Sequence, residues 1–538
     1  SFWLAFLLAA DHLKSGWAGL AFAAVYLLAP AAQGAVLSDF HASSLMAALF
    51  LFALYAVHRK YWRSYLVLLV PCLLAKEDIS LLVFMLGAWL FFVRHERRIG
   101  AVSMAVGLGW FAVCMLVILP HYNGLSGSPF LPRLAIFGPT VSQSFANLLA
   151  EPGLVVRWLL RPEIRAYLGS LLASGGGLSL FSPATLAIAA PSVAMNVFST
   201  WNWTYSGGAH YSAAILPFVV VSSIYGLGTL ARWLGRLRHV QPENAVLALS
   251  MLVVVISGSQ YLRQGVWPLS KRFSVPRLTA HVRLGAALIG QIPPEASVSA
   301  QSNLYPHLSQ REQAYFFPAV NNADYIVLDV SGVSYPLSVA GLYREARRLL
   351  QSDAYEVAAA QDGYLVMRRS DGPAASIALP ESFYSFALGI PDDIRHPVSV
   401  RFGDELELVG WDYAYLNVVQ GHSLPLTVTL WWRALGELSY DYQFPLFFTR
   451  EDGAIVYVYD QDSASTLWRP PSSWKPGEVI HMETPVLGTG ALKDVLIAVV
   501  QPGQDAWNSE ARLSVSSDQA APSDLLDGNT LYRAFHLP

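Results

Sequence analysis

Long apolar runs fill the first half of the chain, and the second half alternates polar and apolar positions in short segments. Runs of 15–25 mostly apolar residues occupy positions 1–262. A helix needs about 20 apolar residues to cross the hydrocarbon core of a bilayer, so these runs predict membrane-spanning helices. The predicted spans are 1–10, 17–33, 41–57, 64–75 paired with 79–93, 100–119, 164–181, 183–198, 211–231 and 244–262.

The second half predicts two water-exposed domains. Helical and strand patterns alternate over 276–370, with helices at 281–289 and 342–350 and strands at 297–301, 325–329, 355–359 and 364–369. From about 396 the pattern is all-β, with short strands separated by turn sequences, which favours a β-sandwich. We therefore predict a transmembrane domain (1–262), a linker (263–275), an α/β domain (276–370), a connector (371–395) and a β-sandwich domain (396–538).

Composition supports a membrane location for part of the chain. The 538 residues are 54% hydrophobic and 14% charged, whereas ordinary soluble domains carry about 25% charged residues. The formal net charge is −3, and no basic stripe is present, which argues against a nucleic-acid partner. Cys72 and Cys114 both lie in apolar runs, where packing is the expected role.

Two polar stretches interrupt the apolar runs. Asp39 and His41 precede one predicted span, and Lys76-Glu77-Asp78 separates two apolar segments. Charged groups inside a membrane domain are costly unless they face a cavity or each other, so they are functional candidates. The alternatives are a self-neutralised triplet that caps two half-helices and, for His41, a hydrogen bond at the start of a helix.

Basic loops predict the orientation. Lys and Arg gather at 58–63, 94–98 and 232–238, and basic loops favour the cytoplasmic side. If 64–93 is a hairpin, all three fall on that side. The segments 34–41, 120–163, 199–210 and everything after 262 then lie outside, and 141–160 has the pattern of an amphipathic helix on the membrane surface.

Several motifs together resemble a known family. They are Phe40-His41, Lys76-Glu77-Asp78, His210-Tyr211, Pro306-His-Leu-Ser309 with Arg311, and Ala323-Asp324-Tyr-Ile-Val-Leu-Asp329. Over about positions 1–370 the chain resembles the bacterial membrane-protein family called domain of unknown function 2079, which looks related to the GT-C class of glycosyltransferases. The resemblance implies a multi-span, GT-C-like helical domain in the bacterial cytoplasmic membrane, with the α/β domain and the β-sandwich on the extracytoplasmic side.

The C-terminal part carries a second likeness. The segments 402–411 and 474–478 resemble β-sandwich modules appended to such transferases. GT-C enzymes usually carry an essential acidic residue in the first outer loop. The sequence begins downstream of that point, so we expect an N-terminal part to precede it, and the catalytic base cannot be named.

The resemblance implies transfer of a sugar from a polyprenyl-phosphate donor to a glycan, lipid or protein acceptor on the outer face. In such a reaction a carboxylate deprotonates the acceptor while cations or a metal stabilise the leaving phosphate. The candidate catalytic residues are Asp39, His41, Glu77 and Asp78. The candidate substrate- or phosphate-binding residues are Lys76, Arg133, His210 and Tyr211. If a divalent metal (Mg or Mn) takes part, Asp39 and His41 are its candidate ligands.

Two other functions fit the same pattern. A non-catalytic membrane-anchored envelope protein would use its outer domains to bind a glycan or a partner protein. A transporter would use broken helices with polar tips as its substrate site. All three readings place the chain among membrane lipids.

Overall fold

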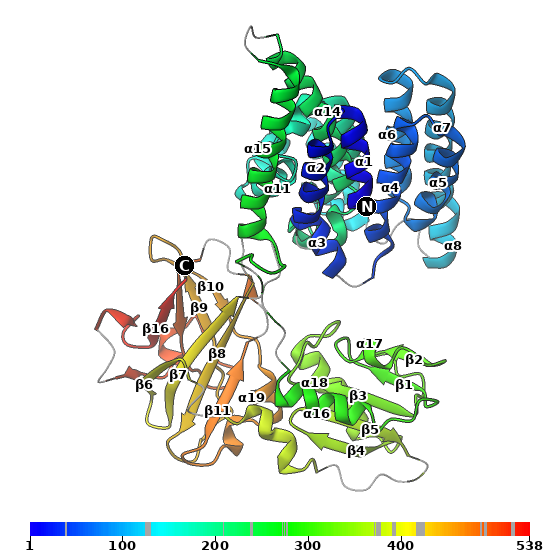
Figure 1. Ribbon diagram of the computed structural model, residues 1–538. Helices are drawn as coiled ribbons and strands as arrows, with labels where there is room; N and C mark the ends of the chain where they lie inside the picture. The colour runs from blue at the N-terminus through cyan, green and yellow to red at the C-terminus, as the bar shows by residue number, and fades with distance from the viewer. Residues whose placement is uncertain are drawn as a thin grey trace. The chain divides into compact units, whose positions relative to one another are not determined.

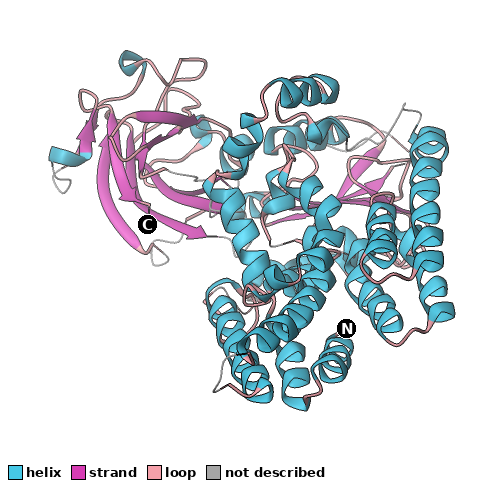
Figure 2. Ribbon diagram, turned by 90° about the horizontal axis from the view of Figure 1, so that it is seen from above, coloured by secondary structure: helices cyan, strands magenta, loops and turns pink. Residues whose placement is uncertain are grey.

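The computed structural model divides the chain into two compact units, each described by itself. The helical unit spans Ser1–Val275, and the strand-rich unit begins at Pro276. Figures 1 and 2 show helices throughout the first and mainly strands in the second. The structure describes residues 1–37, 40–123, 131–207, 209–236, 240–271, 273, 275, 278–370, 372, 378–389, 394–415, 425–484, 487–488, 492–517 and 522–537.

The helical unit packs its helices around one apolar core, to which Phe22, Phe50 and Phe218 contribute fully buried rings. Its helices are α1 (Phe2–Leu13), α2 (Gly16–Leu28), α3 (Pro30–Leu37), α4 (Ala42–His58), α5 (Trp62–Ala75), α6 (Ile79–Phe92), α7 (Arg97–Val113), α8 (Leu119–Asn123), α9 (Val141–Ala150), α10 (Gly153–Leu159), α11 (Pro162–Ala173), α12 (Pro183–Leu186), α13 (Ala190–Val197), α14 (Leu216–Leu234) and α15 (Pro242–Gln264). A π-helical turn, Cys114–Ile118, joins α7 to α8.

Fewer helices than predicted are long enough to cross a membrane. Among the described residues, three qualify by length and apolarity: Arg97–Tyr122, α14 and α15. The pair α2–α3 would make a fourth, but it is bent by 48° where Pro30 interrupts the predicted span 17–33, because proline cannot donate the backbone hydrogen bond that a helix interior requires.

Two further predictions are wrong in their extent. The predicted span 164–181 is too long: α11 ends at Ala173, and Gly176 and Gly177 follow with positive φ angles of 62° and 73°, which end a right-handed helix. The predicted span 183–198 corresponds to one apolar helical segment, Pro183–Val197. The predicted surface helix 141–160 is divided into α9 and α10 at Pro152.

The segment 64–93 forms a helical hairpin. The hydroxyls of Tyr65 and Ser103 are hydrogen-bonded at 2.9 Å, and Trp110 Nε1 donates to the Leu73 carbonyl at 2.8 Å, so α5 and α7 run parallel. Helices α6 and α7 run antiparallel and very close: a Cβ on Gly107 would lie 2.7 Å from the Ser80 oxygen. Small residues permit such close packing in membrane helices. Hence α5 and α6 are antiparallel, and residues 76–78 form the tip between them.

The basic loops meet at the opposite end of the helical unit. Lys60 Nζ and Glu96 Oε1 form an ion pair at 3.0 Å, joining the α4–α5 and α6–α7 loops. Arg59 binds Asp11 at the end of α1, also at 3.0 Å. A Cβ on Gly228 of α14 would lie 3.3 Å from His12 Nε2, so the C-terminal part of α14 lies beside the end of α1. Figure 1 shows the α6–α7 loop at the upper end of this unit and α8 at the lower end.

The first part of the strand-rich unit is a five-stranded mixed sheet in the order β2-β1-β3-β5-β4. Strand β1 is parallel to β2 and β3, and β5 is antiparallel to β3 and β4. The elements are α16 (Ala280–Ile289), β1 (Val298–Ala300), α17 (Tyr305–Leu308), β2 (Ala314–Phe316), β3 (Tyr325–Asp329), α18 (Val339–Leu350), β4 (Tyr355–Gln361) and β5 (Tyr364–Arg369). The helices and strands predicted over 281–369 are confirmed to within a few residues; β2 and α17 were not predicted.

The remaining strands form two sheets that share one core, in which Trp432, Phe402 and Phe448 are buried. The orders are β10-β9-β13-β16-β15 and β11-β8-β7-β6-β14, with β12 beside β8. The strands are β6 (His396–Phe402), β7 (Leu406–Tyr415), β8 (Pro425–Ala434), β9 (Leu446–Thr449), β10 (Ile455–Tyr459), β11 (Val479–Glu483), β12 (Leu487–Gly488), β13 (Asp494–Ile497), β14 (Val515–Ser516), β15 (Leu525–Leu526) and β16 (Leu531–His536), and the helix α19 (Ala464–Trp468) lies between β10 and β11.

Candidate functional site

A cavity of about 590 Å³ opens at the end of the helical unit where the 76–78 tip lies. The start of α4, the α5–α6 tip, the segment after α8 and the turn before α14 all contribute to its wall. Residues far apart in the sequence thus meet in one place. The predicted site residues that line it are His41, Lys76, Glu77, Asp78, Arg133, His210 and Tyr211.

The charged triplet is only partly self-neutralised. Lys76 Nζ lies 3.3 Å from Asp78 Oδ1, and the Asp78 side chain is 14% exposed. Asp78 directly precedes α6, yet its carboxylate does not cap that helix, which the structure describes throughout. Within the described part of the chain, the half-buried Glu77 carboxylate has neither a hydrogen-bond nor an ion-pair partner. Glu77 is therefore the acidic group of the triplet that is available to a ligand.

Two histidines stack beside the triplet. The rings of His41 and His210 have centroids 3.6 Å apart and an interplanar angle of 13°, and the Tyr211 ring lies 4.3 Å from His210. His41 occupies the position before α4, but its ring makes no capping hydrogen bond to that fully described helix. His41 therefore does not cap α4, and a hydrogen bond of its ring to another group at the helix start stays a prediction.

A buried polar network holds the His210–Ser212 turn in place. Asn196 Nδ2 donates to the Tyr167 hydroxyl at 2.8 Å and to the Tyr211 carbonyl at 3.1 Å. The hydroxyls of Tyr167 and Ser212 are hydrogen-bonded at 3.1 Å, and Thr204 donates to the Asn196 carbonyl at 2.8 Å. Sequence reasoning missed these residues, because single polar residues in apolar segments give no pattern. The only available signal was the presence of Asn196 inside a predicted span.

Arg133 is fixed at the cavity wall from a different segment. Its guanidinium lies over the Trp201 ring at 5.2 Å from the centroid, and its backbone carbonyl accepts from Thr200 N at 2.7 Å. A cation over an indole ring is held by the negative face of the ring. This contact connects the segments 131–134 and 199–205 at the cavity.

The cavity adjoins an apolar pocket of about 260 Å³. Leu134 and Met195 line both, and α9 supplies Val141, Phe145 and Leu148 to the second. Phe145 is 61% exposed. The site therefore combines charged and hydrogen-bonding groups with a neighbouring apolar surface, an arrangement that suits an amphiphile.

Among the described residues, no group of three or more His, Cys, Asp or Glu side chains could hold a metal ion. The parallel rings of His41 and His210 cannot converge on one ion, and hard cations prefer several oxygen ligands. Asp39, predicted as a catalytic residue and a metal ligand, lies outside the described residues.

Helices that are long and apolar enough to cross a membrane mark the chain as a membrane protein. The chain belongs to the family of predicted membrane proteins called domain of unknown function 2079 (DUF2079), whose sequence model matches residues 1–366. That match includes the helical unit and the mixed sheet as far as β5, but not the two packed sheets. No curated protein and no solved structure matches the chain.

Proposed function

We propose that the chain is an integral membrane glycosyltransferase, which transfers a sugar from a polyprenyl-phosphate donor to an acceptor hydroxyl on the outer face of the membrane. The observation that supports this is the convergence of Lys76, Glu77 and Arg133, with two histidines, on one cavity beside an apolar pocket. A lipid phosphate needs cations for its head and apolar surface for its chain. This arrangement agrees with the likeness to the GT-C class.

The position of the cavity supports an outward-facing site. The basic loops meet at the other end of the helical unit, and basic loops favour the cytoplasmic side. The end of α15 lies on the cavity side, because Val266 N donates to Gln33 of α3 at 3.0 Å. In this orientation the chain leaves the membrane outward after α15, and the strand-rich unit follows outside the cytoplasm.

The proposed reaction assigns a role to each charged group. The oxygen of the acceptor hydroxyl forms a bond to C1 of the sugar with inversion, and its proton passes to a carboxylate. Glu77 lines the cavity, and we assign this role to it in place of the outer-loop acid that the family likeness implies. The bond between C1 and the phosphate oxygen breaks, and its electron pair leaves with the polyprenyl phosphate. Lys76 and Arg133 balance the charge that develops on that phosphate. Asp78 acts by holding Lys76, from which it lies 3.3 Å away.

The apolar pocket supplies the second half of the donor site. Its lining is almost entirely hydrocarbon and includes Phe145 and Leu148 on one face of α9. In our proposal the first isoprene units of the donor lie there, and the phosphate points past Leu134 toward Arg133. Each buried methylene group contributes about 0.8 kcal/mol to binding, so a few isoprene units are enough to orient the head.

The decisive experiment measures sugar release from polyprenyl-phosphate hexoses by the protein in lipid nanodiscs, with a set of membrane-lipid, glycan and peptide acceptors. We expect Glu77→Gln to lower turnover at least about 100-fold, because the base is lost. The matched control is Glu96→Gln, at the opposite end of the unit in an ion pair with Lys60, which should leave turnover unchanged.

The other functions predict different results. A non-catalytic envelope protein consumes no donor with any acceptor. A transporter moves its substrate across a sealed vesicle without breaking the bond between sugar and phosphate. Equal turnover in Glu77→Gln and in the unsubstituted protein contradicts the assignment of the base.

A further inference from the structure

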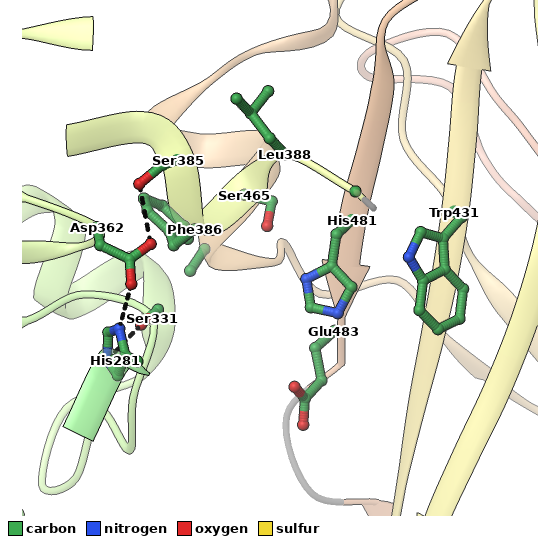
Figure 3. A pocket seen from close by; sticks show the side chains of 12 residues that line it. His281, Ser331, Asp362, Ser385, Phe386, Leu388, Trp431, Ser465, His481 and Glu483 are labelled. Atoms are coloured by element: carbon green, nitrogen blue, oxygen red, sulfur yellow. Dashed lines mark hydrogen bonds and ion pairs between the residues drawn. The ribbon is translucent and has the colours of Figure 1, made fainter. Parts of the chain in front are cut away.

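The strand-rich unit contains a second cavity, of about 420 Å³. Figure 3 shows it from close by, with His281 and Asp362 on one wall and His481, Glu483 and Trp431 on the other. The first wall comes from the start of α16 and from the β4–β5 turn, and the second from β8 and β11. Pockets of 300–1,000 Å³ are typical of small-molecule sites.

One wall is a rigid network around His281. Its Nδ1 lies 2.8 Å from Asp362 Oδ2, and its Nε2 lies 3.4 Å from Asp329 Oδ2. The Ser385 hydroxyl donates to the other oxygen of Asp362 at 2.9 Å. The hydrogen bonds to Asp329 and Asp362 raise the pKa of His281 to about 9. This wall therefore presents one imidazolium and the Asp362 carboxylate, and the buried Asp329 holds the imidazolium from behind.

The network resembles a Ser-His-Asp triad but cannot work as one. Ser331 Oγ lies 3.4 Å from His281 Nε2, opposite the nitrogen that faces Asp362. However, the Ser331 hydroxyl donates to Asp329 at 2.7 Å. A triad histidine must be neutral to accept the serine proton, and His281 is held in its charged form near neutral pH. The cavity wall is therefore arranged for binding rather than for nucleophilic attack.

The opposite wall adds a carboxylate and ring surfaces. His481 packs against Trp431, with ring centroids 5.5 Å apart, and Glu483 follows two residues later on the same face of β11. Between the walls, Phe386 and the 39% exposed Leu388 supply apolar surface. Polar groups and hydrocarbon thus alternate around the cavity.

The charges select the ligand. Among the lining side chains, Asp362 and Glu483 outnumber the charged His281. The lining therefore repels phosphate and carboxylate groups. Both ring nitrogens of His281 are already occupied by its partners, whereas each carboxylate can accept up to about four hydrogen bonds. A fitting ligand therefore donates several hydrogen bonds, carries no negative charge and presents C–H surface to the ring of Phe386.

We propose that this cavity is a saccharide-binding site, which takes one or two sugar residues without acidic groups. Hydroxyl groups of the sugar donate to Asp362 and Glu483, and its C–H face packs on Phe386. The site binds sugar independently of the reaction proposed for the helical unit, and none of its residues takes part in that reaction.

The test measures binding of soluble sugars to the whole chain in nanodiscs by calorimetry and saturation-transfer NMR. The probes are methyl glucoside, N-acetylglucosamine, its disaccharide and glucosamine, each up to about 10 mM, which covers the millimolar affinities expected of small sugars. Glucuronate and glucose 6-phosphate serve as anions with the same ring. We expect saturable binding of at least one uncharged or amino sugar, and binding at least about tenfold weaker for both anions.

Two variants and two matched controls locate the site. Glu483→Gln and Phe386→Ala should each weaken binding of the sugar about tenfold. The controls Glu437→Gln and Tyr457→Ala change exposed positions outside the cavity and should leave binding unchanged. A circular dichroism spectrum like that of the unsubstituted chain confirms folding. The proposal is overturned if no sugar in the set binds saturably, if the anions bind as tightly as the neutral sugars, or if both cavity variants bind as the controls do.

Discussion

The imidazole rings of His41 and His210 lie stacked with centroids 3.6 Å apart, although 168 residues separate them in the sequence. One ring precedes α4, and the other belongs to the turn before α14. The stack joins two segments of the cavity wall, and both histidines line the cavity. The contact between the rings contributes to packing, and the ring nitrogens supply the polar chemistry.

Substituting His41 separates these two parts. We expect His41→Phe to keep the stack and the thermal midpoint but to weaken binding of a short-chain polyprenyl phosphate about tenfold, because the ring loses its hydrogen-bond donors to phosphate. His41→Ala should lower both the thermal midpoint and the affinity for the polyprenyl phosphate. Differential scanning fluorimetry and a binding titration in detergent check this. Unchanged affinity in His41→Phe would remove His41 from the proposed phosphate site.

The acidic residues of the triplet should differ in their effects on stability. Asp78→Asn leaves Lys76 without the carboxylate 3.3 Å away, and we expect a loss of about 1–2 kcal/mol, between the values for exposed and buried pairs. Glu77→Gln should change stability by less than about 0.5 kcal/mol, since Glu77 holds no partner among the described residues. Thermal unfolding of the two variants side by side measures the difference, and equal losses would contradict it.

A pair of glycines on α7 tests the packing of the helical hairpin against α7. A Cβ on Gly107 would meet the backbone of α6 at 2.7 Å, whereas a Cβ on Gly109 has nothing within 4 Å. Gly107→Ala should destabilise the unit by about 1–3 kcal/mol through overpacking. Gly109→Ala should be neutral or stabilise by up to about 1 kcal/mol, because alanine favours the helix. Unfolding midpoints decide the matter, and similar midpoints in the two variants would exclude this packing.

The sequence predicted local elements well where one physical signal dominated. Strands β3 and β5 were predicted at their observed bounds, and the Asp362-Gly363 turn between β4 and β5 has the positive φ angles of 48° and 78° that a two-residue hairpin loop requires. The charged tip at 76–78 was found because charges are conspicuous in an apolar sequence.

The contacts within the site could not be predicted from the sequence. Nothing in the apolar segments shows that Asn196 anchors the turn of Tyr211 or that Arg133 lies over Trp201, because these contacts depend on how non-adjacent helices pack. Hydrophobicity also cannot show that the predicted span 164–181 breaks after Ala173. Its apolar length suggested a complete span, and Gly176 and Gly177, with their positive φ angles, end the helix early.

The strand-rich unit should lose stability as the pH rises from neutral to alkaline. The two carboxylates raise the pKa of His281 from its ordinary 6.5 to about 9. A raised pKa in the folded state adds stability that is fully present below pH about 6.5 and is lost as the pH rises through about 9. The shift corresponds to about 3 kcal/mol at most, and we expect about 2 kcal/mol, because the side chain is 28% exposed.

Urea unfolding followed by circular dichroism from pH about 6 to about 10 should show this loss of stability with rising pH. It should vanish in His281→Gln, whose amide does not titrate, and persist in His307→Gln, an exposed histidine elsewhere in the unit. An unchanged slope in His281→Gln would assign the pH dependence to other groups and remove the imidazolium from the cavity wall.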